Sequence, residues 1–326
     1  MTLAHSYLKV NYSLRPAKQV ERRMLIDGFH LLSEAKILLR DYHYIGMGSI
    51  HFYDFSLFHK FLGIDNMTSV EISPNIPKRV QFNVPFQTTI KIKTNRAIGD
   101  EISTIRPSDD KKYVVWLDYD TVLSTDMLRD IQLAVTTLPM GSILLVTVDT
   151  EPPDRSSGNR EDNTPENKRL SHNYFHEIAP DDVDHFFKEK DFRYEKLPGI
   201  NTKLIECAIR EGIRTRIDGE FLPLYNFIYA DTHRMLTLGG IIASKADKVS
   251  IQKSRFAQME YARFSFDEKP FLIRVPIITR KEHLYLESHM PCGPRWRPVD
   301  FEISVEDLKD YRKIYRYFPS YAELFL

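Results

Sequence analysis

The sequence predicts an α/β fold, a doubly wound and mostly parallel sheet with a late antiparallel strand pair and a C-terminal α+β extension. Along residues 14–150, short apolar or β-branched runs alternate with amphipathic stretches, which is the pattern of successive strand–helix–strand units. Two of the runs, KYVVWLD (112–118) and GSILLVTV (141–148), are apolar almost throughout, as buried parallel strands are.

The predicted elements follow in order. The first is an amphipathic helix from Ala17 to Leu32, because apolar residues recur there at helical spacing and Pro16 suits the first turn. The strands then fall at 42–47 (YHYIGM), 67–72 (MTSVEI), 88–93 (TTIKIK), 112–118 and 141–148, with helical patterns at 50–64, 77–86 and 124–138.

The second half of the chain begins with a change of character. Residues 151–173 are rich in Pro, Ser, Asn and mixed charge, which predicts a mobile loop. An antiparallel strand pair is predicted at 221–230 and 235–243, so we expect a Rossmann-like domain at 1–243 and a C-terminal extension at 244–326 packed on it. The other predicted elements are helices at 180–188, 202–211, 281–289 and 304–317 and a strand at 271–278.

The composition indicates a folded, neutral protein. Of 326 residues, 42% are hydrophobic, enough to bury a sizeable core. The 45 basic and 45 acidic residues balance, which argues against coating nucleic acid by bulk charge but leaves a local basic patch open. With only Cys207 and Cys292, neither a disulfide framework nor a cysteine-paired zinc site is possible. No apolar run suits a signal peptide or a membrane span, so we expect a cytoplasmic protein that does not enter membranes.

Three predicted strand ends carry groups suited to binding a ligand. These are Gly46 and Gly48 after the first strand, Glu71 after the second, and the run 118–120 (DYD) after the fourth. In doubly wound sheets ligands bind at the carboxyl ends of the strands. Glycines let the backbone approach a ligand closely, and an acid after the second strand is placed to accept both hydroxyls of a ribose.

The order of these motifs is similar to that of class I S-adenosylmethionine-dependent methyltransferases, possibly of the O-methyltransferase type. The resemblance covers residues 14–243 and rests on IGMG, SVE, WLDYD, GSILLVTV and the late strand pair. It implies S-adenosylmethionine as the cofactor, with the glycine turn under its methionine part, Glu71 on its ribose and residues 118–120 facing the transferred methyl group. The sequence departs from the family pattern before Gly46, where Tyr44-Ile45 stands in place of the usual acid. A turn with such bulky residues would narrow the cofactor pocket.

From these positions we predict Asp118 and Asp120 as catalytic residues, with Tyr119 as a cofactor contact. Arg15 and Lys18, just before and within the first helix, either reach a cofactor carboxylate or substrate phosphate or are charges on the helix surface. The alternative to cofactor contact for Gly46 and Gly48 is that they form an ordinary turn between a strand and a helix.

Two further patterns have alternative interpretations. Asp118, Asp120 and Asp149 could hold Mg²⁺, but acids that solvate strand ends are the favoured interpretation and no metal is predicted. Basic and aromatic residues interleave at 295–297 (RWR) and 311–317 (YRKIYRY), which suits either stacking on nucleic acid or, as we favour, a packing helix.

The predicted function is S-adenosylmethionine-dependent methyl transfer to an oxygen or nitrogen atom of an unidentified acceptor, which is a small molecule or a macromolecule. One alternative is a binding or partner subunit that keeps the fold without catalysis. The other is a nucleic-acid methyltransferase that uses the C-terminal basic and aromatic segments.

Overall fold

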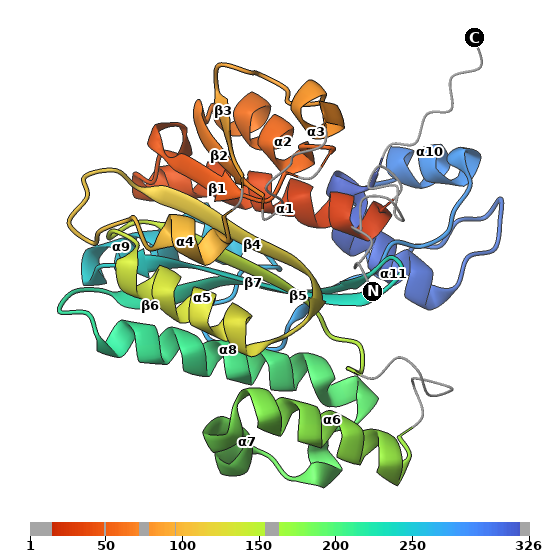
Figure 1. Cartoon of the computed structure of the whole chain (residues 1–326). Helices are drawn as coiled ribbons and strands as arrows, with labels where there is room; N and C mark the ends of the chain where they lie inside the picture. The colour runs from red at the N-terminus through yellow and green to blue at the C-terminus, as the bar shows by residue number, and fades with distance from the viewer. Residues whose placement is uncertain (1–14, 49, 72–77, 95, 154–162, 320–326) are drawn as a thin grey trace.

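The computed structural model describes residues 15–48, 50–71, 78–94, 96–153 and 163–319, which form one mixed sheet with helices on both faces (Figure 1). The strand order is β3-β2-β1-β4-β5-β7-β6-β8. Only β7 runs antiparallel to its neighbours β5 and β6, so the predicted fold class is confirmed. The strands are β1 (His43–Gly46), β2 (Asn66–Val70), β3 (Ile90–Lys93), β4 (Tyr113–Val122), β5 (Ile143–Asp149), β6 (Glu220–Ala230), β7 (Arg234–Ala243) and β8 (Phe271–Ile273).

The helices form one layer on each side of the sheet. Helices α1 and α2 lie on one face, whereas α4, α5 and α8 lie on the other (Figure 1). The described helices are α1 (Pro16–Leu32), α2 (Tyr53–Leu62), α3 (Lys78–Phe82), α4 (Ile98–Ile102), α5 (Thr125–Thr137), α6 (Pro165–Ile178), α7 (Pro180–Phe186), α8 (Leu197–Arg214), α9 (Lys245–Lys253), α10 (Arg280–Ser288) and α11 (Val305–Ile314). Among them, none is long and apolar enough to cross a membrane.

The inner strands of the sheet contribute to two separate apolar cores, because successive side chains point to opposite faces. On β4, Trp116 packs in the core beneath α1, whereas Leu117 packs in the core beneath α5. Both side chains are fully buried. Asp118, the next residue, therefore points to the α1 face, and Tyr119 points to the α5 face.

The segment after β5 differs from the prediction. Residues 154–162 lie outside the described residues, but 165–173 are helical and belong to α6, so a loop over 151–173 was wrong for that part. The Thr164 hydroxyl caps this helix by accepting a hydrogen bond from the Asn167 amide at 3.1 Å, and Pro165 stands in its first turn. The polar composition of residues 151–173 did not indicate this helix, because Phe175, the buried apolar residue that packs it on the protein, lies beyond that stretch.

The C-terminal extension is joined to the sheet. β8 pairs in parallel with β6, but it is shorter than the predicted strand 271–278. The extension also holds α1 by hydrogen bonds, because Asp27 accepts from the hydroxyls of Tyr261 at 2.8 Å and Tyr317 at 2.7 Å. The boundary at residue 243 stays a prediction, since residues on both sides of it share one core.

Candidate active site

The three predicted strand ends meet at one edge of the sheet. β1 lies between β2 and β4, with Gly46 in register with Ser69 and Ile45 in register with Val115. Glu71 therefore follows β2 two residues beyond the level of Gly46. Asp118 lies a little further along β4, beside the loop that leaves β1.

A short chain of hydrogen bonds joins the glycine turn to the acid after β2. The Gly48 amide donates to the Ser69 hydroxyl oxygen at 3.0 Å, and that hydroxyl donates to Oε1 of Glu71 at 3.2 Å. Ser69 is fully buried, so it fixes the turn and the carboxylate relative to each other. The predicted convergence of Gly48 and Glu71 is what the structure shows.

The glycines, however, are packed against the chain itself. A Cβ on Gly46 would stand 2.4 Å from the Tyr44 hydroxyl, and one on Gly48 would stand 2.5 Å from the Phe52 ring. Phe52, at φ 48°, donates its amide to the Gly48 carbonyl at 2.9 Å and so closes the turn over the glycine. The side chains of Tyr44 and Phe52 therefore fill the space next to the Cα atoms of these glycines, so a ligand cannot approach the loop from there. Only the peptide groups of the loop remain available for contact with a ligand.

A buried ion-pair cluster lies beneath the end of β4. Lys18 of α1 places its Nζ 2.8 Å from Oδ1 of Asp118 and 2.9 Å from Oε2 of Glu21. The ammonium also lies 4.4 Å from the centroid of the Trp116 ring. Side-chain exposure falls from 23% at Asp118 to 1% at Lys18 and 0% at Glu21, so Asp118 is the only one of the three that meets solvent.

This placement corrects the expectation for Lys18 as a surface charge. Its side chain lies inside the molecule, and its ammonium is bound by two carboxylates. Contact with a cofactor carboxylate would require it to leave one of them. The pattern missed this, because a lysine between apolar helix positions has no local sign of burial.

The remaining residues of the fourth-strand motif point elsewhere. Tyr119 faces α5 and donates its hydroxyl to Asp130 at 2.8 Å. The register of β4 against β5 shifts between Asp118 and Val122, a bulge that re-aims the side chains between them. Asp120 lies in this bulge and is exposed. The structure thus brings only Asp118 to the α1 face beside the glycine turn.

The three aspartates considered for a metal do not converge. Asp149 is buried and accepts the Glu151 amide at 2.7 Å, whereas Asp118 is paired with Lys18. Over the ranges that the structure describes, no three His, Cys, Asp or Glu side chains form a group able to hold a metal ion. The structure therefore does not bring these three residues together as ligands for Mg²⁺.

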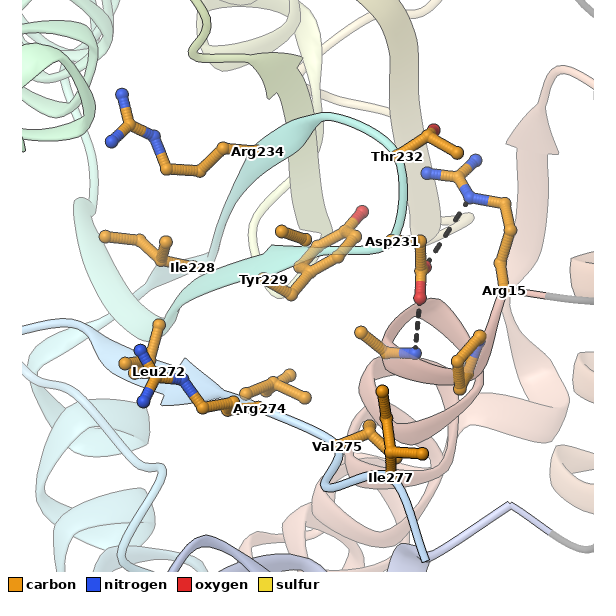
Figure 2. Close-up of a pocket in the computed structure, with 14 residues that line it drawn as sticks. Arg15, Ile228, Tyr229, Asp231, Thr232, Arg234, Leu272, Arg274, Val275 and Ile277 are labelled. Atoms are coloured by element: carbon orange, nitrogen blue, oxygen red, sulfur yellow. Dashed lines mark hydrogen bonds and ion pairs between the residues drawn. The ribbon is translucent and has the colours of Figure 1, made fainter. Parts of the chain in front are cut away.

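A cavity of about 710 Å³ opens at the same edge of the sheet, between the start of α1 and the ends of β6 and β8. Figure 2 shows Asp231, in the turn between β6 and β7, reaching Arg15 and the first turn of α1. The ring of Tyr229 lines the cavity and lies 5.6 Å from Nζ of Lys18. Tyr229 therefore separates this cavity from the buried ion pairs beneath Asp118.

The C-terminal basic and aromatic segments pack on the protein. Arg312 donates to the Trp296 carbonyl at 2.7 Å, and Tyr311 is fully buried. Arg297 likewise donates to the carbonyls of Pro294 and Trp296. These contacts support the packing interpretation that the sequence favoured.

A family described as "Putative O-methyltransferase" matches residues 10–326. The chain belongs to this family. Together with the strand order, that membership makes the protein a Rossmann-like class I methyltransferase, as the order of the strand-end motifs predicted. No curated protein matches it.

This methyltransferase is also similar to several solved structures. One is Trm1 from Pyrococcus horikoshii with S-adenosyl-L-methionine, at 12% identity and a TM-score of 0.40 over 71% of this chain and 58% of that one. The O-methyltransferase TomG from Streptomyces achromogenes has 15% identity and a TM-score of 0.35 over 72% of this chain and 92% of that one. Fibrillarin from Methanococcus jannaschii has 13% identity and a TM-score of 0.34 over 63% and 68%.

Proposed function

We propose that this methyltransferase binds S-adenosylmethionine across the carboxyl ends of β1, β2 and β4 and transfers the methyl group to an oxygen or nitrogen atom of an acceptor. The observation that carries the proposal is the Gly48–Ser69–Glu71 hydrogen-bond chain beside Asp118. It holds a carboxylate next to a loop that presents peptide groups, which is the donor and acceptor set that an adenosine and its ribose need.

The residues of the site would have distinct roles. Glu71 would accept the hydroxyls of the ribose, and the peptides of residues 46–48 would border the methionine part. Arg15 precedes α1, pairs with Asp231 and lines the cavity that we give to the acceptor, so we assign it to a polar group of the acceptor and not to the cofactor's carboxylate. Tyr119 points to α5, and we assign it to support of β4. When bound, S-adenosylmethionine supplies an activated methyl group on sulfur.

Asp118 would act on the acceptor. Its side chain is 23% exposed, and its Oδ1 is held by Lys18, so the carboxylate is oriented before any ligand arrives. It can accept a hydrogen bond from the attacking O–H or N–H and take the proton as the methyl group transfers. Asp120, exposed in the bulge, is the second candidate for this contact.

We place the body of the acceptor in the cavity beside Tyr229; Asp118 does not line this cavity, so the reacting group of the acceptor would extend past Tyr229 to the end of β4. Its walls combine apolar side chains such as Val275 and Leu272 with Arg274, which suits an acceptor with an apolar body and a polar group. We also expect the chain to work in the cytoplasm, since both of its cysteines are free thiols.

Calorimetric titration with S-adenosylmethionine and S-adenosylhomocysteine tests the cofactor proposal. We expect binding by the wild type and a loss of affinity of at least about tenfold in Glu71→Ala, because charged hydrogen bonds are worth roughly 1.5–3 kcal/mol. The matched control is Glu211→Ala, which removes an exposed carboxylate of α8. No binding of either compound at millimolar concentration would refute the proposal and favour a partner subunit without catalysis.

A further inference from the structure

Lys18 is held between two carboxylates that differ in their surroundings. Its Nζ lies 2.8 Å from Asp118 and 2.9 Å from Glu21, and Trp116 covers it from the sheet. Glu21 lies one turn along α1 and is fully buried, while Asp118 reaches solvent. The Lys18 ammonium thus forms ion pairs with two carboxylates, and only that of Asp118 is exposed to solvent.

The two acids of this cluster differ in how readily they bind a proton. Burial raises the pKa of Glu21, and the charge of Lys18 only partly offsets this. Burial alone would raise the pKa of Asp118, but the charge and hydrogen bond of Lys18, together with the weaker effects of Arg22 and Arg15, hold this pKa below its usual range. Of the two acids, Glu21 therefore binds a proton more readily than Asp118.

Other charged groups also face Asp118. Arg22 and Arg15, from α1, act in the same direction as Lys18, although more weakly. Arg22 is itself engaged by Asp54 of α2. Tyr229, from β6, lies over Lys18. None of these places a hydrogen-bond donor on Oδ1 of Asp118, which is the particular contact that Lys18 makes.

We propose that Lys18 and Glu21 are positioning residues for methyl transfer: the buried ammonium fixes one oxygen of Asp118 and leaves the other to the acceptor, while Glu21 holds the ammonium from its buried side. The inference rests on the proposed function of Asp118. It explains why a lysine, whose burial without partners would be costly, lies inside a helix–sheet interface.

A second consequence concerns the cofactor. Lys18 is occupied on both sides, so it supports the acceptor side of the site and makes no contact with S-adenosylmethionine. A variant that removes its charge should then change the titration of Asp118 without weakening cofactor binding. A direct cofactor contact would give the opposite pattern.

The test is a ¹³C NMR titration of protein labelled at the carboxyl carbons of Asp and Glu, with Asp118→Asn and Glu21→Gln used to assign the two signals. In the wild type we expect Asp118 to titrate below the ordinary range for aspartate and Glu21 above that for glutamate. Lys18→Met should raise the midpoint of Asp118 by about one pH unit or more. Glu21→Gln, which copies a neutral carboxyl, should leave that midpoint unchanged.

Lys203→Met is the matched control, because Lys203 also pairs with a glutamate three positions away, Glu206, at 3.0 Å. It should leave the Asp118 midpoint unchanged. An Asp118 midpoint that does not move in a folded Lys18→Met variant would overturn the proposal. If Lys18→Met does not fold, the wild type and Glu21→Gln still test the proposal. A Glu21 titration midpoint in the ordinary range for glutamate in the wild type would overturn it, and so would a change in the Asp118 midpoint in Glu21→Gln.

Cofactor binding separates this inference from the proposed function. Calorimetry should give the same affinity for S-adenosylmethionine in Lys18→Met as in the wild type, within about threefold. A larger loss, with the fold intact, would make Lys18 a cofactor contact and refute its positioning role. No binding by the wild type would refute the proposed function while leaving the titration of Asp118 to be judged on its own.

Discussion

The carboxylate of Asp231 accepts a hydrogen bond from the backbone amide of Ala17 at 2.8 Å, across 214 positions of sequence. It also accepts the Lys18 amide at 3.1 Å. Helix α1 has Arg15 at its N-cap position, and no side chain of that residue caps it. The turn between β6 and β7 therefore caps the helix that carries Lys18, and so fixes where Lys18 enters the site.

Loss of this cap should destabilise the protein. We expect Asp231→Ala to lower the free energy of unfolding by about 1–2 kcal/mol, since two amides at a helix start lose their acceptor and a favourable charge. Asp231→Asn keeps one acceptor oxygen and should cost less. Urea denaturation measures both, and an alanine variant as stable as the wild type would show that the cap contributes nothing.

The turn after β1 should not tolerate a methyl group. Gly48→Ala would place a Cβ 2.5 Å from the Phe52 ring and 2.8 Å from the Ser69 hydroxyl, which we expect to cost about 1–3 kcal/mol of stability. Gly199→Ala is the matched control, because a Cβ there meets nothing within 4 Å in α8. The control should be neutral or stabilising by up to about 1 kcal/mol, as alanine favours a helix.

The tie between α1 and the C-terminal extension can be tested at Asp27. Its Oδ2 accepts the hydroxyls of both Tyr261 and Tyr317. Tyr317→Phe should cost about 1 kcal/mol, because one hydrogen bond is lost while its acceptor keeps a partner. Asp27→Ala leaves the hydroxyls of Tyr261 and Tyr317 without this acceptor and should lower the free energy of unfolding by more. Equal losses of stability in thermal unfolding of the two variants would contradict this order.

Stability should fall in mild acid because of His43. Burial, and then Lys111, Lys91 and Lys93, lowers the pKa of this histidine to about 4. The unfolded chain binds the proton near pH 6.5, so between pH 6.5 and about 4 protons favour unfolding, by at most about 1.4 kcal/mol per pH unit. Denaturation curves should show this slope, which His43→Gln removes and His185→Gln, at an exposed position, keeps.

Local patterns in the sequence predicted most of the fold. The apolar runs around Trp116 and Leu145 are buried strands, and the spacing from Val20 to Phe29 gives the buried face of α1. The alternation of strands and helices predicted a parallel sheet with Gly48, Glu71 and Asp118 at its carboxyl edge, whereas the strand order that brings them together came from the tertiary structure. The bulge beyond Asp118 could not be predicted, because residues 114–117 of β4 are buried on both faces and show no alternation whose phase a bulge would change.

What the sequence determined by itself was therefore the succession of elements and the residues at their ends, because both depend on neighbours a few positions apart. Only the tertiary structure decided how these residues are used. Lys18 meets Asp118 across 100 positions, and the cap on α1 comes from Asp231 at still greater separation. Such contacts depend on how distant elements pack, and periodicity along the chain carries no information about that.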